Sequence, residues 1–252
     1  MMTLSQNNNN INKAPCFIIH VRPYKERARL VEIFSLEYGR LGAVAYIGKK
    51  GFKNRALLQP FVPLNLNLFK NRGNLWNIGE VKVSGDPFNF KLPMLFCAQY
   101  LNELLFYLLH EQDSMPQLFA SYIKSLEVLS RIDDNFSKDG DEHLRFALRS
   151  FEEILLKSLG YAPSFEDTLG KKIIPECRYA FAPSQGFFLC DDPSFPTVLG
   201  QSLILISQGH YKGITELNAL QIIHSSLIKK LLGNRTLQSQ KLYRQYLKDQ
   251  EI

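Results

Sequence analysis

Residues 39–61 read GRLGAVAYIGKKGFKNRALLQPF, an apolar run that is interrupted by a cationic segment and then resumes. The run LGAVAYIG and the segment that ends in QPF have the composition of short strands, and KKGFKNR has that of the connection between them. This connection places four cations around one phenylalanine and one glycine. The pattern predicts a hairpin with a cationic tip, and what such a tip contacts depends on the segments around it.

Short β-type segments lie on both sides of this hairpin, between residue 16 and about residue 83: CFIIHVRPY, RLVEIFSLEYG, LLQPFVPLNLNLF and LWNIGEVKVSG. In residues 64–68 leucine alternates strictly with asparagine, which is typical of a strand with one buried and one wet face. Five short strands within about 70 residues predict a small closed barrel, and the OB-fold is the commonest such barrel among nucleic-acid binders.

After residue 86 the apolar spacing becomes helical in PMLFCAQYLNELLFYLLHEQ, LFASYIKSLEVLSRI and EHLRFALRSFEEILLKSLGY, the last expected to begin near Asp141. The segment IIPECRYAFAPSQGFFLCDD predicts a β-hairpin with SQG at its turn. Helical spacing returns at Glu216, with Thr215 as the expected N-cap, and continues through KLYRQYLK. The predicted fold class is therefore α+β, an N-terminal OB-fold β-barrel followed by a mostly α-helical domain with a small β-hairpin insertion.

The expected domain boundaries follow these changes of pattern. Residues 1–14 are expected to form a disordered tail, residues 15–85 the OB-fold domain, residues 86–161 and 202–252 the helical domain, and residues 162–201 the hairpin insertion. The opening residues have no apolar core of signal-peptide length, and no apolar window approaches the ~20 residues that span a bilayer. We therefore expect a cytoplasmic protein.

The positive charge is concentrated in the first third of the chain. The whole sequence carries +6, but residues 1–85 hold 13 Lys and Arg against 4 Asp and Glu. Residues 86–160 hold 7 cations against 12 anions, and the remaining residues hold 10 against 8. Such asymmetry indicates a polyanion as partner, with a merely solvated basic surface as the alternative.

Enzymatic sites do not emerge from the residue pattern. GAVAYIGKK only superficially resembles a phosphate-binding loop, because Gly42 and Gly48 are separated by five residues rather than four and Lys50 occupies the place of the magnesium-binding hydroxyl. The five histidines lie on unrelated elements, and no nucleophile–base arrangement can be assembled from their spacing. The sequence predicts a protein without catalytic residues or cofactors.

A metal site is not expected either. Cys177 and Cys190 flank the predicted hairpin, and neither has a second Cys or His within two to four residues. A structural zinc site needs four ligands, usually in two close pairs. We predict two isolated thiols and no bound metal.

Two cationic segments of the predicted barrel combine phosphate-neutralising and base-stacking side chains. The candidate DNA-binding residues are Arg22, Tyr24, Lys25, Arg27 and Arg29 in one segment, and Lys49, Lys50, Phe52, Lys53 and Arg55 in the other. The alternative for Tyr24 and Phe52 is that their rings plug the ends of the barrel.

The order of segments resembles that of the bacterial RecO family of recombination mediators and DNA repair proteins, over essentially residues 14–247. The pieces that carry the resemblance are FIIHVRPYKERARLVEIFSLEYGRLGAVAYIGKKG, ALLQPFVPL, Glu80, YLNELLFYLL, FEEILLKSLGY, RYAF with GFFLC, and QSQKLYRQYL. The resemblance implies the OB-fold, the helical domain and a zinc-ribbon-like β-insertion, which holds zinc through four cysteines in some members. Here SFEDTLG contains no cysteine, and only Cys190 lies near an expected ligand position.

The resemblance also implies a function and its partners. Members of the family bind single- and double-stranded DNA, anneal complementary strands without nucleotide hydrolysis, and act with RecR to load RecA onto DNA coated by single-strand binding protein. They bind the C-terminal tail of that protein on the helical domain, where Arg149 occupies the expected position and Arg145 lies one turn away. An ordinary amphipathic helix with solvated arginines is the alternative for this pair.

A second class of function stays open from the residues alone. A non-catalytic scaffold protein whose basic barrel binds acidic protein tails would show the same charge distribution. A nuclease is disfavoured, because the only acids of the basic domain are Glu26, Glu32, Glu37 and Glu80, which form no evident metal cluster.

Overall fold

The computed structural model describes residues 9–46, 57–70, 75–132 and 138–250. The chain divides into two compact units, which we call unit 1 (Met1–Leu126 with Gln238–Ile252) and unit 2 (Glu127–Leu237). Within the described ranges, no helix combines the length and the apolar character that crossing a bilayer requires.

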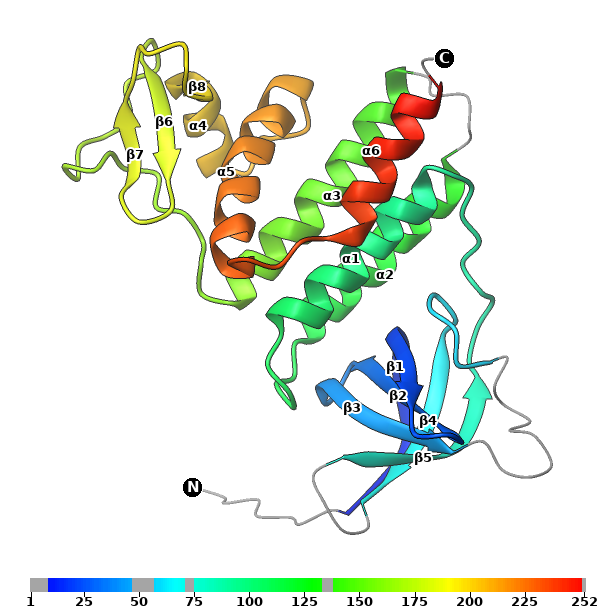
Figure 1. The fold of residues 1–252 in the computed structure, drawn as a ribbon. Coiled ribbons are helices and arrows are strands. Elements are labelled where there is room, and N and C mark those ends of the chain that lie inside the picture. The colour runs from blue at the N-terminus through cyan, green and yellow to red at the C-terminus, as the bar shows by residue number, and fades with distance from the viewer. Residues whose placement is uncertain (1–8, 47–56, 71–74, 133–137, 251–252) are drawn as a thin grey trace, which may run out of the picture. The chain divides into compact units, whose positions relative to one another are not determined.

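Unit 1 begins with a closed five-stranded barrel (Figure 1) of order β1-β2-β3-β5-β4. Its strands are β1 (Asn10–Tyr24), β2 (Ala28–Ser35), β3 (Gly39–Tyr46), β4 (Leu64–Phe69) and β5 (Trp76–Val83). The predicted OB-like barrel is therefore confirmed. All neighbours pair antiparallel except β3 and β5, which meet in parallel at Ala43↔Trp76 and Val44↔Asn77.

Strand β1 closes the barrel because it pairs with two strands at once. Its first half lies against β4 and its second half against β2, and Cys16 is opposite both Leu64 and Ser35. The pairing shifts register between Ile18 and His20 and between Ile11 and Ala14. Such irregularities bend a strand and increase its twist, which a 15-residue strand needs to follow a small barrel.

The start of β1 corrects the predicted tail, which we expected to extend through residue 14. The strand begins at Asn10, and Ile11 and Ala14 are buried in the barrel interior. Two apolar side chains within a mostly polar stretch are thus enough to extend the strand, because β4 supplies a partner for their backbone.

The barrel interior follows the alternation that the sequence shows. Leu64, Leu66 and Leu68 of β4 are buried, together with Val31, Ile33 and the other members of the interior cluster. On the outer side, Phe17 and Phe34 pack against Phe119 and Tyr122, and the Phe17–Tyr122 ring centroids are 5.3 Å apart. Large aromatic rings bury much apolar area, so the helical part of unit 1 is attached to the barrel by a hydrophobic contact.

The helices are α1 (Met94–Leu108), α2 (Pro116–Arg131), α3 (Lys138–Ser158), α4 (Gly200–Ser207), α5 (Ile214–Leu232) and α6 (Gln238–Gln250). Helix α3 begins at Lys138, three residues before the start that we expected near Asp141. Helix α5 begins after Gly213, so the predicted N-cap Thr215 lies in its first turn instead. Helices α1 and α6 contact each other in unit 1, and α3 and α4 contact α5 in unit 2.

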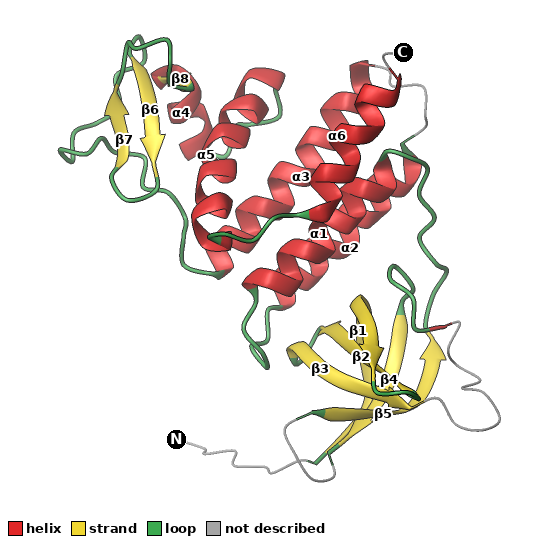
Figure 2. Ribbon diagram, viewed as in Figure 1, coloured by secondary structure: helices red, strands yellow, loops and turns green. Residues whose placement is uncertain are grey.

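Unit 2 contains a small sheet of order β7-β6-β8, formed by β6 (Arg178–Ala182), β7 (Gly186–Leu189) and β8 (Thr197–Leu199). Figure 2 shows this sheet beside α4 and α5. The predicted β6–β7 hairpin is present, with its turn at residues 183–185, one residue before the expected SQG (residues 184–186). Strand β8 and the eight-residue α4 were not anticipated. Both elements are too short to produce a recognisable period.

Candidate nucleic-acid interface

Three strands of the barrel place two tyrosines in one row on the outer surface. Tyr24 is opposite Ala28, and Ala28 is opposite Tyr46. Directly opposite residues of paired strands share a face, so both rings flank the small alanine on one side of the sheet. The alternating residues Val31, Ala43 and their neighbours belong to the interior, which makes this the outer face. Tyr46 is 56% exposed and was not among the predicted site residues.

Cations surround this row. Arg22 lies on the same strand face as Tyr24, and Lys25 and Arg27 lie in the turn that follows; all three are exposed. The Lys25 Nζ atom is 5.3 Å from the centre of the Tyr24 ring, within the range of a cation–π contact. The arrangement offers phosphate-neutralising groups beside two rings on which bases can stack.

Arg29 differs from the other predicted cations of this segment. It pairs across the sheet with Pro23 and Ala45, and Ala45 belongs to the barrel interior, so Arg29 is on the opposite face from Tyr24. Its guanidinium donates to the Ala28 carbonyl at 3.4 Å. The β-strand period of two therefore separates Arg29 from Arg22, although the two are close in sequence.

The Tyr24 ring does not plug the barrel. It packs against Ala28, Leu30 and Val44, which form a small cluster separate from the interior. The ring is half-buried by these neighbours and keeps part of its surface free. The other predicted segment, with Lys49, Lys50, Phe52, Lys53 and Arg55, lies outside the described residues.

A further cation and two aromatic rings, which the sequence analysis missed, lie at the β4–β5 end of the barrel. The Lys70 Nζ atom is 4.7 Å from the centre of the Trp76 ring, and Phe69 is partly exposed beside them in the chain. Trp76 is buried, and its indole nitrogen has no hydrogen-bond partner. The sequence could have pointed to this cation, because Lys70 directly follows LNLNLF, a strand whose buried and exposed sides are evident from its alternation.

The outer face that carries Tyr24 and Tyr46 also contacts α1, at a point farther along the strands. Arg40 donates to the Phe106 carbonyl at 3.0 Å, and its guanidinium lies 3.4 Å from Glu32 and 3.5 Å from Glu111. Burial raises the pKa of Glu32, Arg40 opposes this effect, and Glu111 adds to it. Glu32 and Arg40 are largely buried and Glu111 is exposed, and this ion cluster holds the end of α1 against the barrel, whereas Tyr46 on the same face is exposed.

Among the described residues, no group of three or more His, Cys, Asp or Glu side chains is arranged to hold a metal ion. Cys177 and Cys190 are half-buried free thiols at the open end of the β6–β7 hairpin. The Cys190 amide donates to the Arg178 carbonyl at 3.1 Å, so the hairpin is held there by its backbone. The zinc-ribbon detail of the predicted fold is not confirmed.

In unit 2, the two arginines of α3 have different surroundings. Arg149 is only 8% exposed, and it lies 2.9 Å from Glu152, whose other oxygen is 3.1 Å from His224 Nδ1. Arg145 is partly exposed and is held by Asp141 at 2.8 Å and by the Asn218 side chain at 3.0 Å. The expected solvent-facing rim thus contains Arg145, whereas Arg149 lies in an internal ion pair.

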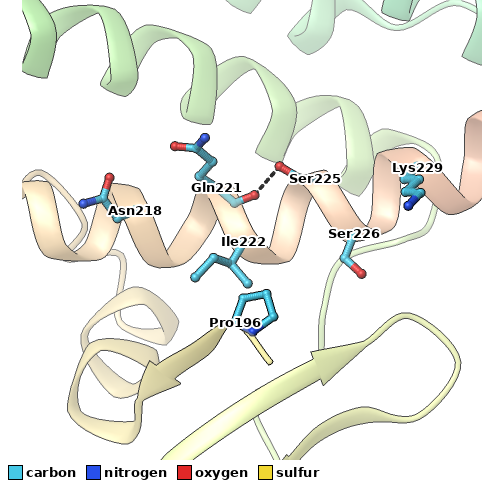
Figure 3. Close-up of a pocket in the computed structure, with 7 residues that line it drawn as sticks. All are labelled: Pro196, Asn218, Gln221, Ile222, Ser225, Ser226 and Lys229. Atoms are coloured by element: carbon cyan, nitrogen blue, oxygen red, sulfur yellow. Dashed lines mark hydrogen bonds between the residues drawn. The ribbon is translucent and has the colours of Figure 1, made fainter. Parts of the chain in front are cut away.

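Asn218 also lines an open groove of about 500 Å³ along α5 (Figure 3). Its apolar walls are Ile222 and Pro196, and its polar lining continues through Gln221, Ser225 and Ser226 to Lys229. Ser225 donates its hydroxyl hydrogen bond to the Gln221 carbonyl within the helix. The lining therefore runs along α5 from Asn218, which accepts a hydrogen bond from Arg145, to Lys229, which is the cation among the lining residues.

Comparison with known proteins agrees with this architecture. The family model described as "Recombination protein O N terminal" matches residues 10–85, which cover the barrel. The model described as "Recombination protein O C terminal" matches residues 90–203. The chain belongs to the recombination protein O family.

Curated RecO relatives match over nearly the whole length of the chain. The DNA repair protein RecO of Methylococcus capsulatus is 32% identical over 90% of this chain and 91% of its own length. Those of Tolumonas auensis and Vibrio cholerae are 30% and 32% identical, and each covers more than nine-tenths of both chains. The RecO resemblance predicted from segment order is confirmed.

Proposed function

We propose that this chain is a non-enzymatic recombination mediator that binds single- and double-stranded DNA and anneals complementary strands without nucleotide hydrolysis. Its membership of the RecO family makes it a protein of DNA repair and recombination. The observation that carries the proposal is the Tyr24–Ala28–Tyr46 row with exposed Arg22, Lys25 and Arg27 around it. Annealing requires above all that the repulsion between two polyanions be neutralised, which such a surface supplies.

The barrel is proposed to bind one DNA strand through both its phosphates and its bases. Arg22, Lys25 and Arg27 neutralise the backbone, while Tyr24 and Tyr46 stack on bases irrespective of sequence. The residues Lys49, Lys50, Phe52, Lys53 and Arg55 are proposed to extend this surface, because they follow Tyr46 in the chain. Arg29 is proposed to contribute only general electrostatic attraction, since it lies on the opposite strand face.

The partner proteins are also part of the proposal. We infer that the protein acts with RecR in the cytoplasm, associated with the nucleoid, and helps to load RecA onto DNA coated by single-strand binding protein. The tail of that protein is proposed to bind unit 2 in the α5 groove, between Arg145 and Lys229. A carboxylate can accept a forked hydrogen bond from Arg145, and an apolar residue fits against Ile222 and Pro196. Arg149 is proposed to support this site by positioning α3 through Glu152.

A salt titration tests the DNA-binding part. Binding of a mixed-sequence oligonucleotide is measured by fluorescence anisotropy for the wild type and for R22Q/K25Q/R27Q. We expect the variant to bind more weakly at every salt concentration, with a log–log slope smaller by up to about three units, roughly one for each lost phosphate contact. The matched control K124Q/R131Q/K212Q removes three exposed cations outside the barrel and should keep the wild-type slope.

The alternative, a scaffold whose barrel binds acidic protein tails, predicts a different result. In that case poly-glutamate competes with the oligonucleotide at equal charge concentration, and Tyr46→Ala changes neither interaction. An affinity for poly-glutamate equal to that for DNA would contradict the proposed function.

A further inference from the structure

Helix α6 presents a cationic face away from α1. Lys241, Arg244 and Lys248 are all exposed. They are spaced by three and four residues, so they form one stripe along the helix. Ser239 is buried and Tyr243 and Tyr246 are half-buried; these side chains occupy the opposite side of the helix, which faces α1. The stripe is therefore the outward face of α6, flanked by the polar amides of Gln240 and Gln245.

The cations of this face are not compensated within the described structure. None of the three forms an ion pair with an acid in the described ranges. Like charges at these spacings destabilise a helix, and Lys241 lies close to the positive end of the helix dipole. The first turn of α6 contains no acid of its own. Lys248, in the last turn, suits the helix dipole, whereas Lys241 and Arg244 stand where their charges do not favour the helix.

The helix is nevertheless held firmly in unit 1. Glu103 of α1 accepts hydrogen bonds from the Gln238 amide at 2.9 Å and from the Ser239 amide at 3.1 Å, and also from the Ser239 hydroxyl. A carboxylate at this place caps the helix and neutralises its dipole. Near the other end, Tyr246 packs against Phe96 at 6.1 Å. These contacts place a rigid cationic stripe on the outside of α1.

The stripe is separate from the barrel surface. Phe106 of α1 contacts the barrel, Glu103 lies one turn before it, and Phe96 lies ten residues before it. At 1.5 Å per residue, α6 therefore begins near the barrel and extends about 15 Å away from it along α1. From Lys241 to Lys248 the stripe spans about 10 Å, the axial distance of about three phosphates of one strand at 3.4 Å each.

We propose that the outward face of α6 binds the sugar-phosphate backbone of a second nucleic-acid strand while the barrel holds the first. This inference rests on the proposed annealing function and assigns its second strand to a site. The charge of the face, its linear spacing and the amides of Gln240 and Gln245 suit a phosphate backbone. The face has no aromatic ring for base stacking, so it binds without regard to sequence.

The test compares three proteins in two assays. The α6 variant K241Q/R244Q/K248Q keeps good helix formers, and K124Q/R131Q/K212Q removes the same charge from exposed positions elsewhere. The first assay measures the affinity for one short labelled oligonucleotide at limiting DNA. The second measures capture of a second, non-complementary labelled oligonucleotide by protein already saturated with the first, followed by the rate of annealing of complementary strands.

We expect the α6 variant to bind the first oligonucleotide within about twofold of wild type, and to lose second-strand capture and annealing by at least tenfold. The control variant K124Q/R131Q/K212Q should lose less than threefold in either assay. If the α6 variant captures the second strand and anneals at wild-type levels, the inference is overturned and the proposed function stays intact. Failure of the wild type to bind any oligonucleotide would overturn the proposed function itself. If the α6 substitutions abolish only poly-glutamate binding, the face serves an acidic protein, and the inference is wrong.

Discussion

The imidazole of His20 stacks on the ring of Phe106, with centroids 4.7 Å apart and planes inclined by 25°. His20 lies on β1 and Phe106 near the end of α1, so this pair joins the barrel to the helices of unit 1. The guanidinium of Arg40 lies 5.7 Å from the same ring. One phenylalanine is thus contacted by two side chains of the barrel, and the contact lies on the strand face that also carries Arg22 and Tyr24.

The charge of His20 should respond to this environment. Burial lowers the pKa of His20, Arg22 lowers it further, and Glu103 partly offsets both. A group with a lowered folded pKa stabilises the fold above its unfolded value near 6.5, and that stability is lost as the pH falls through the folded pKa. We expect NMR titration to give a pKa below 6.5 for His20, and R22Q to raise it. A wild-type value above 6.5 would contradict the burial of His20 beside Arg22.

Gly39 is expected to tolerate no side chain. Its φ is +63°, and a Cβ atom there would lie 1.8 Å from the Asp113 carbonyl oxygen. Gly39→Ala therefore combines a left-handed backbone with a clash against the loop that follows α1. We expect it to lower the free energy of unfolding by about 2–4 kcal/mol in urea denaturation.

Gly170→Ala provides the matched control for Gly39. Its φ is +70°, but nothing lies within 4 Å of the added methyl group. We expect only the backbone cost of about 1–2 kcal/mol. Equal losses for the two variants would show that the contact between the β2–β3 turn and Asp113 is not formed in solution.

The buried carboxylate of Glu152 is expected to be essential for unit 2. It lies between Arg149 of α3 and His224 of α5, and all three side chains are at least nine-tenths buried. Glu152→Gln leaves the Arg149 charge without its counter-ion, so we expect a loss of about 3–5 kcal/mol in the free energy of unfolding. The neighbouring Glu153 accepts a hydrogen bond from the Tyr211 hydroxyl, and Glu153→Gln should cost about 1 kcal/mol, the range for one hydrogen bond. A loss of under 1 kcal/mol for Glu152→Gln would mean that the pair is solvated.

Tyr46 should contribute directly to DNA binding. If a base stacks on its exposed ring, Tyr46→Ala weakens binding of a single-stranded oligonucleotide by about 1–3 kcal/mol. Tyr161 of unit 2 is 41% exposed, and its replacement by Ala serves as the control with no expected effect. Both affinities can be measured by anisotropy at one fixed salt concentration. Unchanged binding by Tyr46→Ala would remove the aromatic row from the DNA path.

Zinc content remains to be measured. We predict no stoichiometric zinc, because two half-buried thiols at the ends of a hairpin cannot supply the four ligands of a structural site. Elemental analysis of protein purified without chelator decides the question. One tightly held equivalent would show that Cys177 or Cys190 recruits ligands from outside the described residues.

The sequence alone determined most of the longer elements and which of their faces are apolar. The Leu64–Leu68 alternation identified a barrel strand and its buried side, and the apolar spacing identified α1, α2, α3 and α5. These features depend on local periods of two and 3.6 residues, which can be recognised within one segment without knowing what it packs against. The family was likewise evident from the order of segments.

Only the tertiary structure decided which of these faces meet. Register between β1, β2 and β3 brings Tyr24 and Tyr46 into one row, and a shift of one residue would have separated them. The spacing of Arg145 and Arg149 showed a shared helix side, but Glu152 and His224 bury one of the two and leave the other exposed. The cations of α6 form a free stripe because Ser239, Tyr243 and Tyr246 take the side that faces α1. Pairing and burial depend on segments distant in the chain, and a local pattern carries no information about them.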